Sequence, residues 1–204
     1  ETVGSGRTDK GVHALQQFAH FDTGKNIHGE QLAFQLNRVL PNDIVVKNIY
    51  EVNPDAHARY DAIARSYQYK INRIKDPFLI NTSYYRRGDL DLNLMNQAAE
   101  SLMGTQDFES FSKVKTDVNH FICTISKSEW TQMGDRIYYS VTADRFLRGM
   151  VRTLVGTMLD IGTGKISLEE LKKITASLDR KKAGRAVPAH GLFLTEVKYP
   201  SDIF

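Results

Sequence analysis

The sequence predicts an α+β fold in which an antiparallel or mixed sheet carries helices packed on one side. Segments with strand and helix periodicity alternate along the 204 residues, without an internal repeat or a low-complexity linker. Two β-rich runs late in the chain are joined by Met133-Gly134-Asp135, a short turn that is typical of an antiparallel hairpin. With 41% hydrophobic residues, the chain can bury one substantial core or two small ones, and residues 74–90 are the place where it would divide.

Strands are expected where the composition is β-rich or apolar and polar residues alternate. The clearest is Ile63–Asn72, because Ile63, Tyr67 and Tyr69 alternate with mostly polar residues and so share one face. The expected strands are Gln17–Thr23, Ile44–Tyr50, Ile63–Asn72, Phe121–Gln132, Arg136–Ala143 and Leu192–Tyr199.

Helices are expected where apolar residues recur every three or four positions between recognisable start and stop signals. They are His28–Leu40 before Pro41, a helix capped by Asp91 and ended by Gly104, Arg145–Ile161 closed by Gly162, and a helix opened by the capping box Ser167-Leu168-Glu169-Glu170.

Composition excludes several classes of protein. The net charge of +3 and the pI near 8.9 are compatible with a polyanionic partner without being diagnostic of one. The single cysteine, Cys123, excludes an internal disulfide and a cysteine-cluster metal site, and its apolar neighbours indicate a buried, inert thiol. No apolar run approaches the roughly 18–20 residues of a membrane span. A soluble, cytoplasmic protein without a membrane partner is therefore expected.

The segment Gly6–Ala14 is the most informative stretch of the chain. It places the carboxylate of Asp9 between Arg7 and Gly11, and a glycine there suits a tight turn. Such a turn can present Asp9 outward, where Arg7 can pair with it or with a phosphate. Spacing alone favours an aspartate that only caps its own turn.

Basic residues gather at two places later in the chain. Arg145, Arg148 and Arg152 fall at helical spacing on an otherwise apolar segment. The first two are expected to extend to solvent, whereas Arg152 is embedded among apolar residues and needs a carboxylate, for which Asp9 is a candidate. The second group, Arg180-Lys181-Lys182 with Arg185, is either a solvated loop or a phosphate-binding one.

Two other motifs carry less weight. Gly162-Thr163-Gly164-Lys165 resembles the end of a phosphate-binding loop, but Ile166 stands where a magnesium-binding hydroxyl belongs, so a helix stop and a turn are expected. Asp9, His13, His20 and Asp22 have no spacing that fits a closed zinc site, and no metal is expected.

Gly6–Ala14 closely resembles the G-R-T-D-A-G-V-H-A signature of the tRNA pseudouridine synthase A family, and five further motifs follow in order. Lys10 and Gly149 depart from residues that are common in the family, but neither is a matched catalytic position. The further motifs are Leu36–Ile44 (L-N-x-x-L-P-x-D-I), His57–Ala62 (H-A-R-F-x-A), Arg65–Tyr69 (R-x-Y-x-Y), Phe146–Arg152 (F-L-x-x-M-V-R) and Pro188–Leu194 (P-A-x-G-L-x-L).

This resemblance implies a pseudouridine-synthase-like fold over residues 1–204 and assigns the roles of five residues. Asp9 would be the catalytic carboxylate, Arg152 its ion-pair partner and Tyr67 the active-site aromatic residue that stacks on the uracil. Leu192 would line the base pocket, and Arg7 would contact phosphate and fill the space left by a flipped base.

The resemblance also implies a substrate and an assembly. The expected activity is isomerisation of uridine to pseudouridine in the anticodon arm of tRNA, at positions 38 to 40, by a homodimer that needs no cofactor. Members of the family carry about fifty further residues before the first motif. The alternatives are a non-catalytic RNA-binding protein and a metal-dependent hydrolase built on Asp9, His13 and His20.

Overall fold

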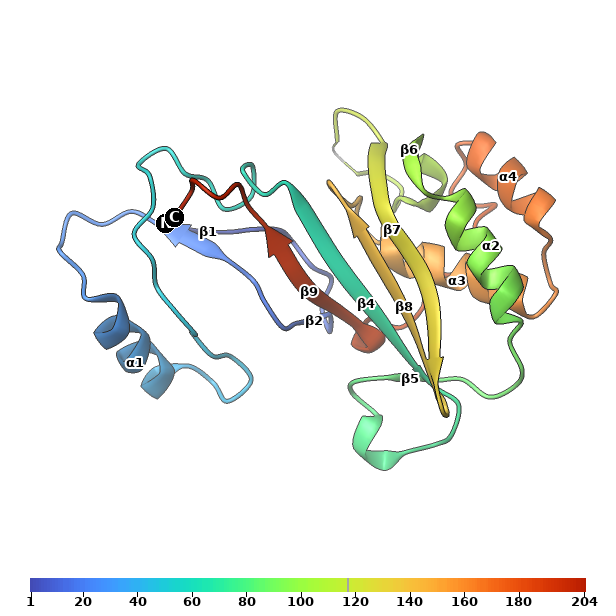
Figure 1. Ribbon diagram of the computed structural model, residues 1–204, viewed down its shortest axis with the longest axis horizontal. Coiled ribbons are helices and arrows are strands. Elements are labelled where there is room, and N and C mark those ends of the chain that lie inside the picture. The colour runs from blue at the N-terminus through green and yellow to red at the C-terminus, as the bar shows by residue number, and fades with distance from the viewer. Residues whose placement is uncertain (117) are drawn as a thin grey trace.

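A seven-stranded mixed sheet forms the centre of the computed structural model, which describes residues 1–116 and 118–204 (Figure 1). Its neighbours are antiparallel except for two parallel pairs, β2 with β9 and β5 with β4. Along the main path the order is β2 (His13–Ala14), β9 (Leu192–Lys198), β4 (Ala64–Asn72), β8 (Arg136–Ala143), β7 (Ile122–Met133) and β6 (Gly104–Asp107), with β5 (Tyr84–Tyr85) beside β4.

Three helices cover one side of this sheet, as Figure 1 shows at its β7 and β8 end. They are α2 (Leu92–Ser101), α3 (Met150–Gly162) and α4 (Leu168–Ala176). The helix α3 lies in the middle of the core, and its Met150, Leu154 and Met158 are fully buried. The α+β class, the mixed sheet and the helices on one side are therefore confirmed.

The N-terminal part lies at the opposite end of the molecule, close to both chain termini (Figure 1). It holds α1 (Gly29–Val39) and a two-stranded antiparallel sheet of β1 (Thr2–Gly4) and β3 (Ala19–Phe21). Ala33 is the buried residue of α1, so this region contributes little to the core. Short 3-10 turns lie at η1 (Pro77–Leu79), η2 (Glu109–Phe111) and η3 (Ala189–Gly191).

Several local signals in the sequence are confirmed by hydrogen bonds. The Asp91 carboxylate accepts from the Leu94 amide at 2.9 Å and so caps α2. Ser167 and Glu170 form the expected capping box at the start of α4. Gly134 turns the β7–β8 hairpin with a φ of 57°, a backbone conformation in which a side chain would be strained.

Two predictions about elements are wrong. The expected helix Arg145–Ile161 begins only at Met150, because Gly149 takes a left-handed φ of 73° that interrupts a helix, so Arg145 and Arg148 do not share a helix face with Arg152. No strand forms at Ile44–Tyr50. The Asn37 side chain satisfies both the N–H and the C=O of Val46, which replaces the partner strand that β-rich composition would need.

Of the helices in residues 1–116 and 118–204, none is both long enough and apolar enough to cross a membrane.

Cys123 is buried as expected, and burial raises the pKa of its thiol to about 12, which makes it a poor nucleophile near neutral pH.

Candidate active site

Asp9 and Arg152 form an ion pair although 143 positions separate them in the chain. A guanidinium nitrogen of Arg152 donates to Asp9 Oδ2 at 2.7 Å, and the two side chains are 21% and 27% exposed. Asp9 stands in the turn between β1 and β2, where its carbonyl accepts from the Val12 amide at 3.1 Å and Gly11 has a φ of 87°. Within the described residues its carboxylate does not hydrogen bond to this turn, so it is available to Arg152 and to solvent.

A second contact holds the other edge of the guanidinium. Arg152 Nε donates to the carbonyl oxygen of Val187 at 2.6 Å, and the Val187 amide donates back to the Arg152 carbonyl at 3.1 Å. Because the planar guanidinium is held on two edges, its orientation toward Asp9 is defined. The segment that supplies Val187 therefore matters for the site.

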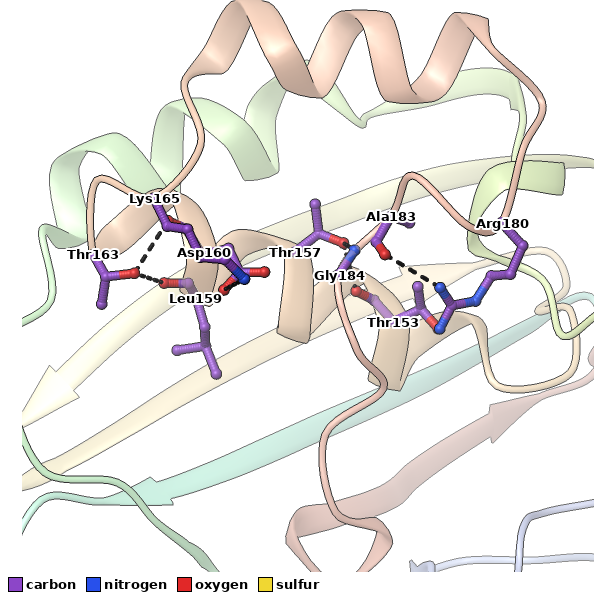
Figure 2. Close-up of polar contacts among 9 residues, drawn as sticks. All are labelled: Thr153, Thr157, Leu159, Asp160, Thr163, Lys165, Arg180, Ala183 and Gly184. Carbon is purple, nitrogen blue, oxygen red and sulfur yellow. Dashed lines mark hydrogen bonds and ion pairs between the residues drawn. The ribbon is translucent and has the colours of Figure 1, made fainter.

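This segment, residues 183–188, is called the strap here; it crosses α3 on its way from α4 to η3. The Gly184 amide donates to the Thr157 hydroxyl at 3.0 Å, and Figure 2 shows Gly184 on the strap directly beside Thr157 on α3. A Cβ on Gly156 would lie 1.8 Å from the Arg185 carbonyl oxygen, and a Cβ on Gly184 would lie 2.8 Å from the Thr157 nitrogen. The two backbones therefore touch, and only glycine at both positions permits this approach.

The end of the strap reaches two further parts of the site. Tyr69, on β4, donates from its hydroxyl to the Pro188 carbonyl at 2.9 Å. Ala189, which follows the strap, lies 3.6 Å from the position of a Cβ on Gly11 in the Asp9 turn. The strap thus connects α3 and β4 through backbone and side-chain contacts, and the residue that follows it lies close to the Asp9 turn.

Tyr67 lies on β4, and its ring packs edge-on against Phe146 with centroids 5.1 Å apart. Burial raises the pKa of its phenol; the Arg65 guanidinium opposes this rise and the Asp9 carboxylate adds to it. The hydroxyl therefore stays protonated at neutral pH, close enough to Asp9 to sense its charge.

Leu192 and Arg7 occupy contrasting positions. Leu192 is 5% exposed at the start of β9 and belongs to the main core cluster, against which Tyr67 and Val12 also pack. Arg7 is exposed two residues before Asp9 and forms no ion pair among the described residues. The structure thus brings Asp9, Arg152 and Tyr67 together, with Leu192 in the supporting core and Arg7 on the outer rim.

Sequence reasoning gave Arg65 no role, yet it is the main anchor of this region. Its guanidinium donates to four carbonyl oxygens, those of Ser5, Arg59, Ala62 and Asp144, at 2.6–3.2 Å. The contact with Ser5 ties β4 to the chain just before the Asp9 turn. The available signal was its place on the same face of the strand as Tyr67, two residues away.

The residues of the hydrolase alternative do not converge. His13 stacks on Phe193 with centroids 4.6 Å apart and contacts the Asn81 carbonyl at 2.7 Å, while His20 Nδ1 accepts from the Ala58 amide. In the part of the chain that the structure describes, three or more His, Cys, Asp or Glu side chains do not gather in a metal-binding group.

The remaining motifs behave as expected or stay surface features. Gly162 ends α3. Lys165 Nζ forms an ion pair with Asp160 Oδ1 at 3.1 Å, and Figure 2 shows this pair beside the Thr163 hydroxyl. In the basic stretch, Lys181 and Lys182 are exposed, whereas Arg180 contacts the Ala183 carbonyl at 3.3 Å.

Comparisons with known proteins identify the family of the chain. The family model described as tRNA pseudouridine synthase matches residues 98–200. The chain is 47% identical to a tRNA pseudouridine synthase A of Bacteroides fragilis, covering 100% of this chain and 82% of the relative. It is 48% identical to the one of Bacteroides thetaiotaomicron, over 100% and 77%, and 42% identical to the one of Bacillus subtilis, over 97% and 81%. On these similarities, the chain belongs to the tRNA pseudouridine synthase A family.

Proposed function

We propose that this chain is an isomerase that converts uridine to pseudouridine in tRNA, with Asp9 as its essential residue. One observation supports placing the reaction at this site. The partly exposed Asp9 carboxylate pairs with Arg152, and the Arg152 guanidinium also donates to the Val187 carbonyl. The protonated Tyr67 lies close enough to Asp9 to be affected by its charge. Family membership supplies the reaction, and this arrangement supplies the groups that the reaction needs.

The reaction is a rearrangement without redox change. The N1–C1′ bond of uridine breaks, the uracil rotates and a C5–C1′ bond forms; the C5 proton is lost and N1 gains a proton. An ionised carboxylate acts as nucleophile or base in such a sequence, and that role falls to Asp9. Arg152 donates to this carboxylate and so orients it. No cofactor is required, because no electrons or high-energy groups enter.

Tyr67 and Leu192 serve the base. The Tyr67 ring is proposed to stack on the uracil, and its protonated hydroxyl to assist proton movement at C5. Leu192 is proposed to give an apolar floor to the pocket, since it lies in the core cluster against which Tyr67 packs.

Arg7 is assigned to the RNA around the target. Reaching a base inside a stem requires flipping it out, at a cost of a few kcal/mol. An exposed arginine beside the catalytic carboxylate can fill the space left in the stack and contact the adjacent phosphate. The proposed substrate is the anticodon arm, at positions 38 to 40, and the compartment is the cytoplasm.

A homodimer is part of the same proposal. Large apolar side chains are exposed on α1 and on the segment after it, including Phe34, Val39 and Val45. Several large exposed apolar side chains on one helix and the segment after it suit a surface that another subunit covers. Sedimentation analysis measures the mass of the particle, and a monomer at all concentrations would contradict the dimer.

The isomerase is tested with unmodified tRNA that carries tritium at uridine C5. The chain should release label, and Asp9→Asn should abolish release while it still binds the tRNA. Tight tRNA binding without release by the unsubstituted chain would favour a non-catalytic RNA-binding protein instead. Full release by Asp9→Asn would remove Asp9 from the chemistry.

A further inference from the structure

A basic hollow of about 460 Å³ lies on the face of the sheet opposite the helices. Lys70 on β4 and Arg136 on β8 point to this face, because their neighbours Tyr69, Ile71 and Ile137 alternate with them and are buried in the core. Its lining contains no Asp or Glu and consists of Gln68, Lys70, Ile71, Leu79, Thr82, Ser83, Thr131, Met133, Arg136 and Tyr138.

The two cations of the hollow lack a neutralising partner. Within the described residues, neither Lys70 nor Arg136 forms an ion pair with a carboxylate. Burial lowers the pKa of Lys70, and the nearby Arg136 guanidinium lowers it further. Lys70 is half-buried and Arg136 is exposed, and a bound anion would relieve the repulsion between these two cations.

The lining also offers neutral groups that suit phosphate oxygens. Thr82, Thr131 and Tyr138 bring hydroxyls, and Gln68 brings an amide N–H₂. Phosphate carries acceptors only, so a site of cations and hydroxyl donors without carboxylates matches it.

The loop of residues 73–88, which includes η1, forms the rim and adds an aromatic side chain. Phe78 is 92% exposed in η1, and the same loop carries the basic residues Lys75 and Arg86. Two acidic residues near this loop are engaged: Asp76 accepts from the Phe78 amide at 2.9 Å, and Asp89 pairs with Arg73 at 2.6 Å. The exposed Asp135 precedes Arg136 in the hairpin turn, and its carbonyl accepts from the Arg73 amide at 2.9 Å. An exposed aromatic ring among cations is the combination that binds unstacked bases and their phosphates.

The hollow connects directly to the Asp9 turn. Lys70 Nζ lies 3.6 Å from the centroid of the Phe193 ring, and His13 stacks on the same ring. His13, four residues after Asp9, also contacts Asn81 of the rim loop at 2.7 Å. A polynucleotide with one nucleotide at Asp9 can therefore continue past β2 toward the hollow.

We propose that the hollow between Lys70 and Arg136 binds backbone phosphates of the substrate RNA outside the target nucleotide, with Phe78 stacking on an adjacent base. This inference rests on the proposed tRNA-modifying function and assigns it a second RNA contact surface. Because phosphate contacts carry no sequence information, this surface would set affinity and register rather than the choice of base.

The test compares two charge-matched double variants in tRNA binding at several salt concentrations. Lys70→Gln/Arg136→Gln removes both cations of the hollow. Lys165→Gln/Lys172→Gln removes two exposed cations on the helix side, each ion-paired at the surface. Loss of two phosphate contacts should lower the slope of log affinity against log salt by roughly 1.5 and weaken binding on the order of tenfold. The control should change neither, and Phe78→Ala should weaken binding about tenfold without changing the slope.

Activity separates this proposal from the isomerase itself. Tritium release at saturating tRNA should keep its kcat in Lys70→Gln/Arg136→Gln while KM rises. If the parent isomerises tRNA and Lys70→Gln/Arg136→Gln keeps the parental tRNA affinity and salt slope, the hollow does not bind RNA. The proposed isomerase would still stand. A parent that neither binds tRNA nor releases label overturns the proposed function.

Two more outcomes count against the proposal. An equal loss of slope in the control variant would assign the effect to bulk charge. Inorganic phosphate is the second probe: phosphate binding that the double variant abolishes, with tRNA affinity unchanged, would assign the hollow to a small anion. Thermal melting within a few degrees of the parent confirms that each variant is folded.

Discussion

Gly156→Ala tests whether the strap is seated on α3 as closely as the contacts require. The added methyl carbon would lie 1.8 Å from the Arg185 carbonyl oxygen and 3.0 Å from its carbon, so the strap must move by roughly 1.5 Å to reach ordinary contact. Alanine favours the helix by about 1 kcal/mol over glycine. Overpacking of this kind costs about 1–3 kcal/mol, and loss of the Gly184–Thr157 hydrogen bond costs about 1 kcal/mol more. The free energy of unfolding should therefore fall by about 2 kcal/mol.

Gly156→Ala should also lower kcat, by more than its loss of stability alone explains. A displaced strap carries the Val187 carbonyl away from Arg152, and an error of about 1 Å in a positioned group can reduce a rate on the order of a hundredfold. Urea denaturation gives the stability, and tritium release at a temperature where the variant is folded gives kcat.

Gly162→Ala is the matched control in the same helix. Its methyl group would meet the flexible Met95 side chain, 2.4 Å from the sulfur, and does not touch the strap. It should lose stability but keep kcat. A Gly156→Ala protein with parental stability and kcat would refute the close seating of the strap.

Three further outcomes follow from contacts at the site and in the core. Thr157→Val removes the hydroxyl that holds Gly184 and should lower kcat several-fold, with rescue by Thr157→Ser, whereas Thr153→Val, which loses a bond within α3, should keep kcat. Tyr67→Phe keeps the ring, so it should lower kcat while KM stays near the parental value, as measured by tritium release. The Cys123 thiol has a raised pKa when folded, so its contribution to stability is complete below pH 9 and is lost between pH 9 and about 12. The free energy of unfolding, measured by urea denaturation at several pH values in that range, should fall less steeply with pH in Cys123→Ala than in the parent. The two slopes should differ by at most about 1.4 kcal/mol per pH unit.

The sequence predicted best what local chemistry determines. The β7–β8 hairpin, the Asp91 cap and the Ser167 capping box each depend on residues within a few positions, and each is present. The start of α3 was predicted too early, because helical spacing extends back through Arg145 and Arg148. The left-handed backbone conformation of Gly149 keeps these two residues outside the helix. The strand expected at Ile44–Tyr50 was wrong because strand formation needs a partner, which composition does not supply.

The candidate site, likewise, could be predicted from the sequence only in part. The motifs name Asp9, Tyr67 and Arg152, and local spacing predicts the glycine turn. The strap has no periodic signal, since it works through a close backbone approach between Gly156 and Gly184. The four carbonyl contacts of Arg65 join segments that are distant in sequence, so only the folded chain reveals them.

The ion pair at the centre of the site contributes little to holding the site together, and this leads to a last prediction. Both partners are about a quarter exposed, and ion pairs of that kind are worth about 1 kcal/mol or less. The Asp9 turn is held instead by hydrogen bonds to backbone carbonyls: the Asp9 carbonyl accepts from the Val12 amide, and the Ser5 carbonyl just before the turn accepts from the Arg65 guanidinium. Asp9→Asn should therefore lower the free energy of unfolding by less than about 1 kcal/mol in urea denaturation while it abolishes tritium release. A loss of several kcal/mol would mean that the carboxylate organises the turn, and the missing activity would then report on folding rather than on chemistry.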